Sequence, residues 1–309
     1  MDVGNLNVAL LGSAGYGRNL GKKGTESDIT FYNLKKGDDT VTFVEPSSYP
    51  EKFSSLFYSL SNADYTLFVV SEIDAYFGEM LLAIHYMDIE RTAFVLQNYH
   101  TAEEIETFLE EIPLRKYEFF EDEPGIIREH LLDIAGRMEG REEEEGTVSI
   151  DHFFNVKGVG TVALGNVVRG SIRKHDDAML LPLKREVHIR SIQKHDDDFE
   201  VASKGDRVGL ALKNVESEEL KRGDVITTEN LSMSQEIRIE LRKNRYWKGE
   251  VKDNTVFHIG HWMQFLPARM KDDVVHAYKP LVYGGHARML VTHLDAGIPR
   301  IVGVGVVKK

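Results

Sequence analysis

The sequence predicts an α/β domain built on a mainly parallel sheet, followed by two all-β domains. Three observations carry this prediction. Over the first 140 residues short apolar runs alternate with amphipathic stretches, and closely spaced runs rich in Val, Ile and Thr follow. An acidic segment bracketed by glycines, residues 140–146, separates the two textures and has the composition of a solvated joint. We therefore place the domains at 1–145, 146–231 and 232–309.

The first domain reads as alternating strands and helices. Strands are predicted at 5–11, 29–33, 41–45, 65–70 and 92–96, of which the last two are nearly all apolar, as in strands buried on both faces. Helices are predicted where apolar side chains recur at three- and four-residue intervals, at 52–62, 77–87, 102–111 and 126–138. This alternation indicates a parallel sheet with helices on both faces.

The remainder of the chain reads as short strands, with no helix of convincing length between them. The strands predicted for the second domain are 148–154, 160–164, 166–168, 179–181, 187–192 and 207–212. Those predicted for the third domain are 235–242, 256–259, 263–266, 281–283, 287–292 and 301–307. This pattern is typical of barrels or sandwiches. The tetrapeptide Lys-His-Asp-Asp at 174–177 and 194–197 lies between strand candidates, so we interpret it as polar hairpin tips and expect no metal site.

Charge divides the chain in the same place. The whole chain carries a net charge of -12, but residues 1–145 carry -17 and residues 146–309 carry +5. Acidity therefore argues against nucleic-acid binding only for the first domain. No apolar run reaches the roughly 18 residues of a membrane helix. With no cysteine and no basic region before the first apolar stretch, we expect a cytoplasmic protein.

The third domain contains a basic cluster interleaved with aromatic residues. Residues 232–309 carry +6, and the cluster consists of Arg242, Lys243, Arg245, Tyr246, Trp247 and Lys248. Such side chains supply phosphate contacts and base stacking, which makes this a candidate nucleic-acid interface. The alternative is an exposed hairpin with solvated lysines and two rings in the core.

The loop after the first strand has the spacing of a phosphate-binding P-loop, G-x-x-x-x-G-K-[ST]. Gly12, Gly15 and Gly17 lie in it, but Arg18 replaces the lysine that reaches the phosphates and Asn19 replaces the hydroxyl that binds magnesium. Glycines at 17, 21 and 24 each cost about 1 kcal/mol in a helix, so the helix that normally holds the phosphate is not expected. The loop is either a turn without ligand or a residual anion site in which Arg18 makes the contact.

Several strings resemble the translational GTPases of the elongation factor Tu and SelB group. They lie in the second domain, at 154–162, 164–172, 189–193 and 202–223, where glycines and apolar positions match over about 85 residues. Among the branches of that group, archaeal SelB-like paralogues are most similar. They include the type proposed as a pyrrolysine-tRNA elongation factor, which GRNLGKKGTESDITFYN at 17–33 particularly resembles. The resemblance implies a P-loop-GTPase-like domain followed by two β-barrel domains. It also implies tRNA binding, with the acceptor end between the first two domains and the T stem on the third.

The first domain departs from the family's nucleotide motifs. The motif D-x-P-G-H falls on 45–49, where Glu45 stands for the aspartate and Tyr49 for the water-orienting histidine, so we expect no catalytic residue. The guanine motif N-K-x-D falls on Gln97, Asn98, Tyr99 and His100, and a neutral histidine cannot accept the two guanine N–H bonds. No S-A-K or S-A-L string precedes 126–138. These positions therefore indicate the remnant of a nucleotide site. We expect no cofactor, and GTP or GDP with magnesium binds only if the site keeps residual nucleotide affinity.

Together these observations predict an elongation-factor-like protein that binds tRNA, the ribosome or a translation partner without turning over GTP. One alternative is an active translational GTPase with divergent motifs that delivers a specialised aminoacyl-tRNA. Another is a regulatory protein that forms protein complexes and does not touch RNA.

Overall fold

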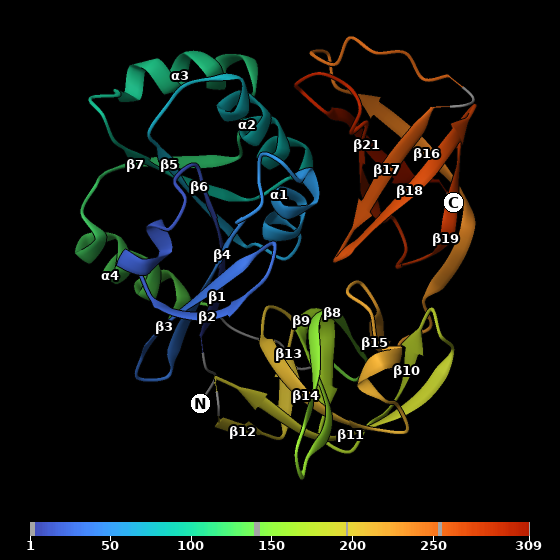
Figure 1. Ribbon diagram of the computed structural model, residues 1–309. Helices are drawn as coiled ribbons and strands as arrows, with labels where there is room; N and C mark the ends of the chain where they lie inside the picture. The colour runs from blue at the N-terminus through green and yellow to red at the C-terminus, as the bar shows by residue number, and fades with distance from the viewer. Residues whose placement is uncertain (1–3, 139–142, 196, 253–254, 309) are drawn as a thin grey trace. The chain divides into compact units, whose positions relative to one another are not determined.

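The computed structural model describes residues 4–138, 143–195, 197–252 and 255–308, and shows three sets of strands (Figure 1). Part of the predicted acidic joint, residues 140–142, lies outside the described residues. The strands lie within 5–121, 146–227 and 232–307, and the first set is the one that carries the α-helices. The boundaries at 145 and 231 stay predictions.

The first sheet has seven strands in the order β2-β3-β4-β1-β5-β6-β7. The strands are β1 (Asn5–Leu11), β2 (Lys22–Glu26), β3 (Thr30–Lys36), β4 (Asp39–Glu45), β5 (Tyr65–Val70), β6 (Arg91–Leu96) and β7 (Lys116–Glu121). The strands from β4 through β7 run parallel, whereas β2 and β3 form an antiparallel edge. The predicted parallel sheet is confirmed, with two strands, β2 and β7, that the sequence did not predict.

Helices cover both faces of this sheet. They are α1 (Phe53–Leu60), α2 (Ala75–Met87), α3 (Ala102–Glu111) and α4 (Pro124–Ala135). One face packs against α4 together with Tyr16 and Leu20, and Tyr32 of β3 belongs to the same buried cluster. The other face packs against α2, where the ring of Phe77 lies 5.1 Å from that of Phe68.

The second set of strands closes into a six-stranded barrel, β10-β15-β8-β9-β14-β11, through the pairing of β10 with β11. Its strands are β8 (Gly146–Val156), β9 (Gly160–Arg173), β10 (Asp177–Leu181), β11 (Arg185–Lys194), β14 (Arg207–Lys213) and β15 (Val225–Thr227). The short strands β12 (Asp197–Phe199) and β13 (Val201–Ser203) pair with β11 and β9. The tetrapeptide at 194–197 joins the paired strands β11 and β12, as a hairpin tip does, although its residue 196 lies outside the described residues. The tetrapeptide at 174–177 forms a turn at His175, but the strands on either side of it, β9 and β10, do not pair with each other, so its interpretation as a hairpin tip is wrong.

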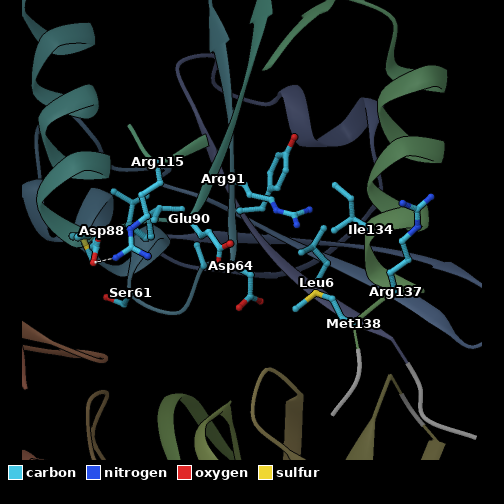
Figure 2. Close-up of a pocket in the computed structure, with 15 residues that line it drawn as sticks. Leu6, Ser61, Asp64, Asp88, Glu90, Arg91, Arg115, Ile134, Arg137 and Met138 are labelled. Carbon is cyan, nitrogen blue, oxygen red and sulfur yellow. Dashed lines mark hydrogen bonds and ion pairs between the residues drawn. The ribbon is translucent and has the colours of Figure 1, made fainter. Parts of the chain in front are cut away.

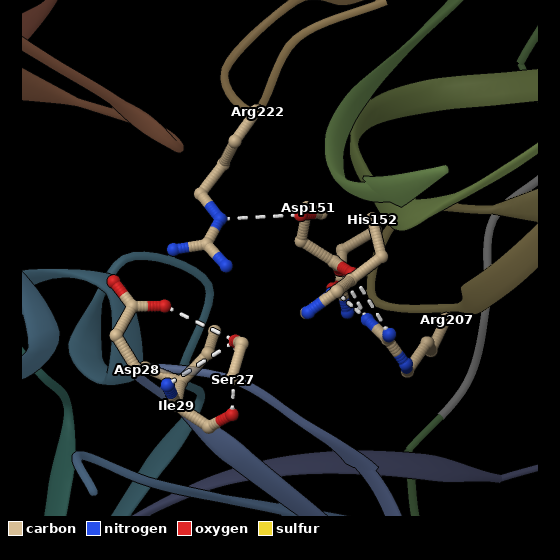
Figure 3. Close-up of polar contacts among 8 residues, drawn as sticks. Ser27, Asp28, Ile29, Asp151, His152, Arg207 and Arg222 are labelled. Atoms are coloured by element: carbon tan, nitrogen blue, oxygen red, sulfur yellow. Dashed lines mark hydrogen bonds and ion pairs between the residues drawn. The ribbon is translucent and has the colours of Figure 1, made fainter. Parts of the chain in front are cut away.

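A buried ion pair joins β8 to β14 of this barrel. Asp151 is 2% exposed and accepts from Arg207 Nη2 at 2.9 Å, while its backbone oxygen accepts from Arg222 Nε at 3.2 Å (Figure 3). Burial alone raises the pKa of a carboxyl, but the charge of Arg207 and the hydrogen bonds from His152 and Arg207 hold the pKa of Asp151 below its usual value. The pair is therefore a structural link between strands.

The third set also closes into a six-stranded barrel, in the order β16-β19-β18-β17-β20-β21. Its strands are β16 (Ser232–Lys243), β17 (Val256–His261), β18 (Gln264–Lys271), β19 (Val274–Tyr283), β20 (Arg288–Thr292) and β21 (Ile301–Val307). The compact unit that holds the first sheet also includes 241–251 and 290–305 of this barrel, and a second unit holds the second barrel and the rest of the third. Among the described residues no helix is long and apolar enough to cross a membrane.

Asp224, in the turn before β15, is expected to make the stability of the second unit depend on pH. Burial raises the pKa of Asp224 from 3.8 to about 6, although its bond from Lys221 N (2.8 Å) and the charges of Lys221 and Lys279 oppose the rise. Because the folded state holds this proton more tightly than the unfolded state, stability falls as pH rises from about 4 to about 6. We expect Asp224→Asn to be more stable than the wild type by about 2 kcal/mol at pH 7.5 and by much less at pH 4. Urea unfolding at both pH values measures this, and an equal difference at the two would contradict it.

Candidate functional site: a remnant of a nucleotide site

The loop that follows β1 keeps the glycines of a P-loop but does not lead into an α-helix. Gly12 has a φ of +90°, and a Cβ there would lie 2.0 Å from the backbone oxygen of Val69, so only glycine fits. The chain then forms a four-residue 3-10 helix (Tyr16–Asn19) and enters the edge strand β2. As the glycine spacing predicted, the helix N-terminus that holds a phosphate in a P-loop is missing.

Two backbone N–H groups of this loop, those of Gly15 and Gly17, face a carboxylate of the chain itself. Gly15 N donates to Glu45 Oε1 at 2.6 Å, and Gly17 N lies 3.4 Å from Glu45 Oε2. Glu45 is 6% exposed and ends β4, the parallel neighbour of β1, which brings its side chain to the loop. A carboxylate offers two anionic oxygens to N–H donors, as a phosphate does. Glu45 therefore takes the place of the anion that a P-loop binds.

The two positions that carry P-loop chemistry lie elsewhere. Arg18 is exposed, and its backbone N donates to Gly15 O at 3.2 Å. Burial and the charge of Glu45 raise the pKa of Tyr32, an effect that the charge of Arg18 partly offsets, so the guanidinium lies beside that tyrosine. Asn19 is also exposed, and its backbone oxygen accepts from Arg128 Nη1 at 3.2 Å. Both side chains were predicted for the remnant site, and neither lines the cavity that remains there.

The side chain of Tyr49 contacts the ion pair between Glu79 and Arg300. Its hydroxyl donates to Glu79 Oε2 at 3.0 Å, and burial together with that carboxylate raises the pKa of Tyr49. Glu79, on α2, is 1% exposed and accepts from Arg300 Nη2 at 2.5 Å and from the backbone N of Arg300 at 2.6 Å. Arg300 also donates to Pro50 O at 3.0 Å, and its guanidinium lies 5.5 Å from the centre of the Tyr49 ring. The hydroxyl of Tyr49 is thus engaged with Glu79 rather than available to orient a water molecule.

The residues predicted for the guanine motif also make contacts within the chain. Gln97 Nε2 donates to Asp122 Oδ2 at 2.7 Å, and the hydroxyl of Tyr16 donates to Asp122 Oδ1 at 2.5 Å. Asn98 Nδ2 donates to the backbone oxygen of Ser71 at 2.9 Å. His100 Nδ1 lies 3.1 Å from Glu104 Oε2 beside the N-terminal cap of α3. Asp122 was not foreseen, because it follows β7, a strand that the sequence did not predict.

A cavity of about 220 Å³ remains beside the loop, and its lining does not fit the phosphates of GTP. Its lining residues include Gly12, Ser13 and the acidic residues Glu45, Glu72 and Asp74. No lysine or arginine is among its described lining residues. Phosphates and carboxylates in one small cavity repel each other, and the N–H donors are already bonded to Glu45. The described lining therefore offers no cation to the phosphates of a nucleotide, whereas its acidic residues are of the kind that hold magnesium.

The predicted basic cluster divides into an internal and an exposed part. Trp247 is 4% exposed, with Lys243 Nζ 4.8 Å from its ring centre, so its ring is not available for base stacking. Arg245 forms an ion pair with Glu111, which also accepts from the hydroxyl of Tyr246 at 3.2 Å. The exposed cations of the cluster are Arg242, Lys243, Arg245 and Lys248, and Arg245 is held by Glu111.

The fold defines a class of protein: an α/β domain of the GTPase-like kind and two β barrels. The family described as Elongation factor Tu domain 2 matches residues 160–227. An uncharacterized protein of Methanocaldococcus jannaschii is 37% identical over 255 residues, which are 82% of each chain. This chain belongs to the same family as that protein, a SelB-like branch of the elongation factor Tu group.

More distant relatives agree with this assignment. The selenocysteine-specific elongation factor of M. jannaschii is 24% identical over 273 residues, covering 75% of this chain and 58% of that protein. The crystal structure of translation elongation factor SelB from Methanococcus maripaludis, in complex with the GTP analogue GppNHp, has a TM-score of 0.83 at 20% identity and covers all of this chain and 80% of that one. The apo form of that protein gives a TM-score of 0.80. The three-domain architecture predicted from the sequence is confirmed.

Proposed function

We propose that this protein is a translation factor of the SelB-like group that works without binding or hydrolysing GTP. The observation that carries the proposal is the carboxylate of Glu45 on the N–H groups of Gly15 and Gly17. A nucleotide would have to displace a buried carboxylate and place its phosphates among further carboxylates, and both steps are unfavourable. GTP and GDP with magnesium are therefore not expected as cofactors.

We further propose that the partner is tRNA, bound in part through the third barrel. The support is the family relationship, the +6 charge of residues 232–309 and the exposed cations of the cluster, of which Arg242, Lys243 and Lys248 are not engaged with Glu111. Exposed cations contribute phosphate contacts whose strength falls with salt. The ribosome or a protein partner is the alternative if tRNA does not bind.

Replacing Arg242, Lys243 and Lys248 together with glutamine is expected to weaken tRNA binding by the full chain and to flatten its salt dependence. Each lost phosphate contact lowers the slope of log affinity against log salt by about 1, so the triple variant should lose up to about 3. Filter binding from 50 to 300 mM KCl measures the slope. The matched control replaces Lys22, Lys36 and Lys52 of the first domain, and an equal loss in both triple variants would contradict an interface on the third barrel.

The same assay tests independence from nucleotide. The affinity for tRNA is expected to be the same without nucleotide and with 1 mM GTP or GDP plus magnesium. A GTP-dependent gain in affinity would favour the alternative of an active GTPase that delivers an aminoacyl-tRNA. Binding of no RNA by the wild type would favour a role in protein complexes.

A further inference from the structure

The first domain contains a second and larger cavity, of about 490 Å³, at the opposite edge of the sheet (Figure 2). Leu6 of β1 lines it, as do Tyr65 and Arg91, the first residues of β5 and β6. The cavity therefore lies at the amino ends of the parallel strands, whereas the loop after β1 and Glu45 lie at carboxyl ends. Its volume is in the range of about 300–1,000 Å³ that small-molecule sites occupy. It is not a part of the remnant nucleotide site.

One wall of the cavity is apolar. Leu6 is 2% exposed and belongs to the buried core, against which the partly buried Ile134 and Met138 pack. Figure 2 shows these three side chains together on the side of the cavity formed by β1 and α4. An apolar surface that a ligand covers favours binding in proportion to the area removed from water.

The remaining lining carries three carboxylates and three guanidinium groups, and most of them are paired inside the protein. The fork of Arg115 binds Asp88 with two bonds of 2.7 Å. Glu90 pairs with Lys116 at 2.9 Å. The side chain of Asp64 accepts from that of Asn7 at 3.0 Å, and Arg137 pairs with Asp133 at 2.6 Å. These pairs leave one lining cation to be accounted for.

That cation is Arg91. Within the part of the chain that the structure describes, its side chain has no ion pair and no hydrogen bond. Figure 2 shows its guanidinium reaching into the space between Glu90 and Ile134. A guanidinium presents parallel N–H groups that match the two oxygens of a carboxylate. It is thus positioned to bind an anion beside the apolar wall.

The surroundings favour a singly charged anion. The carboxylates of Asp64, Asp88 and Glu90 line the same cavity, and so do the C-terminal ends of α1, α2 and α4, whose dipoles are negative. A phosphate with two negative charges would be repelled about twice as strongly as a carboxylate. The single charge of a carboxylate is neutralised by the charge of Arg91. We propose that the cavity binds a small organic carboxylate with an apolar body, its carboxylate on Arg91 and its body on Leu6, Ile134 and Met138.

Calorimetric titration of the full chain tests this proposal, with 4-phenylbutyrate as the carboxylate probe. The wild type is expected to bind it in the millimolar range or tighter, and to bind the neutral 4-phenylbutyramide and the doubly charged phenyl phosphate at least ten-fold more weakly. Arg91→Gln should weaken 4-phenylbutyrate binding ten-fold or more, the loss expected for a charge-assisted pair. Met138→Ala should weaken it about three-fold or more through the loss of apolar contact.

The matched control is Arg128→Gln, which removes an exposed arginine of the same domain that does not line the cavity. This variant should bind the probe as the wild type does, and circular dichroism should show that all variants fold. Absence of binding by the wild type, equal affinity for the carboxylate and the amide, tighter binding of phenyl phosphate, or unchanged affinity in Arg91→Gln would each overturn the proposal.

Discussion

Glu79→Ala is expected to lower the free energy of unfolding by about 3–5 kcal/mol, the loss that follows when one partner of a buried ion pair is removed. Glu79 is 1% exposed, and it accepts from the side chain and backbone of Arg300 and from the hydroxyl of Tyr49. Without it the guanidinium of Arg300 stays buried with no carboxylate to balance it. Urea unfolding at pH 7 measures the loss.

Two variants make this prediction specific. Glu79→Gln keeps an oxygen acceptor for Arg300 and Tyr49 but loses the charge, so it should lie between Glu79→Ala and the wild type. Glu129→Ala removes an ion pair with Lys36 in which both side chains are about two-thirds exposed (64% and 66%), and should cost less than about 1 kcal/mol. Equal losses in Glu79→Ala and Glu129→Ala would contradict the role given to Glu79.

Glu45→Ala is expected to open the P-loop-like loop to anions. The N–H groups of Gly15 and Gly17 then lose their acceptor, which should destabilise the protein by about 1–3 kcal/mol for each buried group left unpaired. An anion that occupies the vacated position restores part of this loss, because it binds the folded state only. We therefore expect sulfate or phosphate to raise the melting temperature of Glu45→Ala and to leave that of the wild type unchanged.

The salt effect is separated from specific binding by matching ionic strength with sodium chloride. Glu45→Gln supplies an uncharged acceptor and should show a smaller loss of stability and a weaker response to sulfate. Equal stabilisation of the wild type and Glu45→Ala by sulfate would mean that the N–H groups are open to anions in the wild type. That outcome would remove the main support for the proposed function.

The apolar pattern of the first domain was sufficient to predict its interior but not its edges. Three elements were predicted with their observed bounds: the strands Asn5–Leu11 and Tyr65–Val70 and the helix Ala102–Glu111. Their buried faces require apolar side chains at regular intervals, and this pattern is visible in the sequence. The strands Lys22–Glu26 and Lys116–Glu121 are exposed or only partly buried edges, and their polar sequences carry no such pattern. Backbone pairing with the neighbouring strand is what forms them.

The positions of the candidate site could be predicted from local sequence, but the contacts that their side chains make could not. Arg18, Asn19 and three close glycines indicated a P-loop without its function. Glu45 was predicted to stand in for the family's aspartate, whereas its carboxylate bonds the glycine loop, 30 positions away in sequence. Glu79 and Arg300 lie 221 positions apart, so no local pattern joins them. Such contacts depend on strand register and packing.

Calorimetric titration of the wild type with GTP, GDP and ATP in the presence of magnesium tests the central claim most directly. The claim is that the chain's own groups occupy the nucleotide site, with Glu45 on the loop and Asp122 bound to Tyr16 and Gln97. We predict no binding of any of the three nucleotides at concentrations up to 1 mM. Micromolar binding of GTP or GDP, accompanied by magnesium-dependent hydrolysis of GTP, would contradict the account.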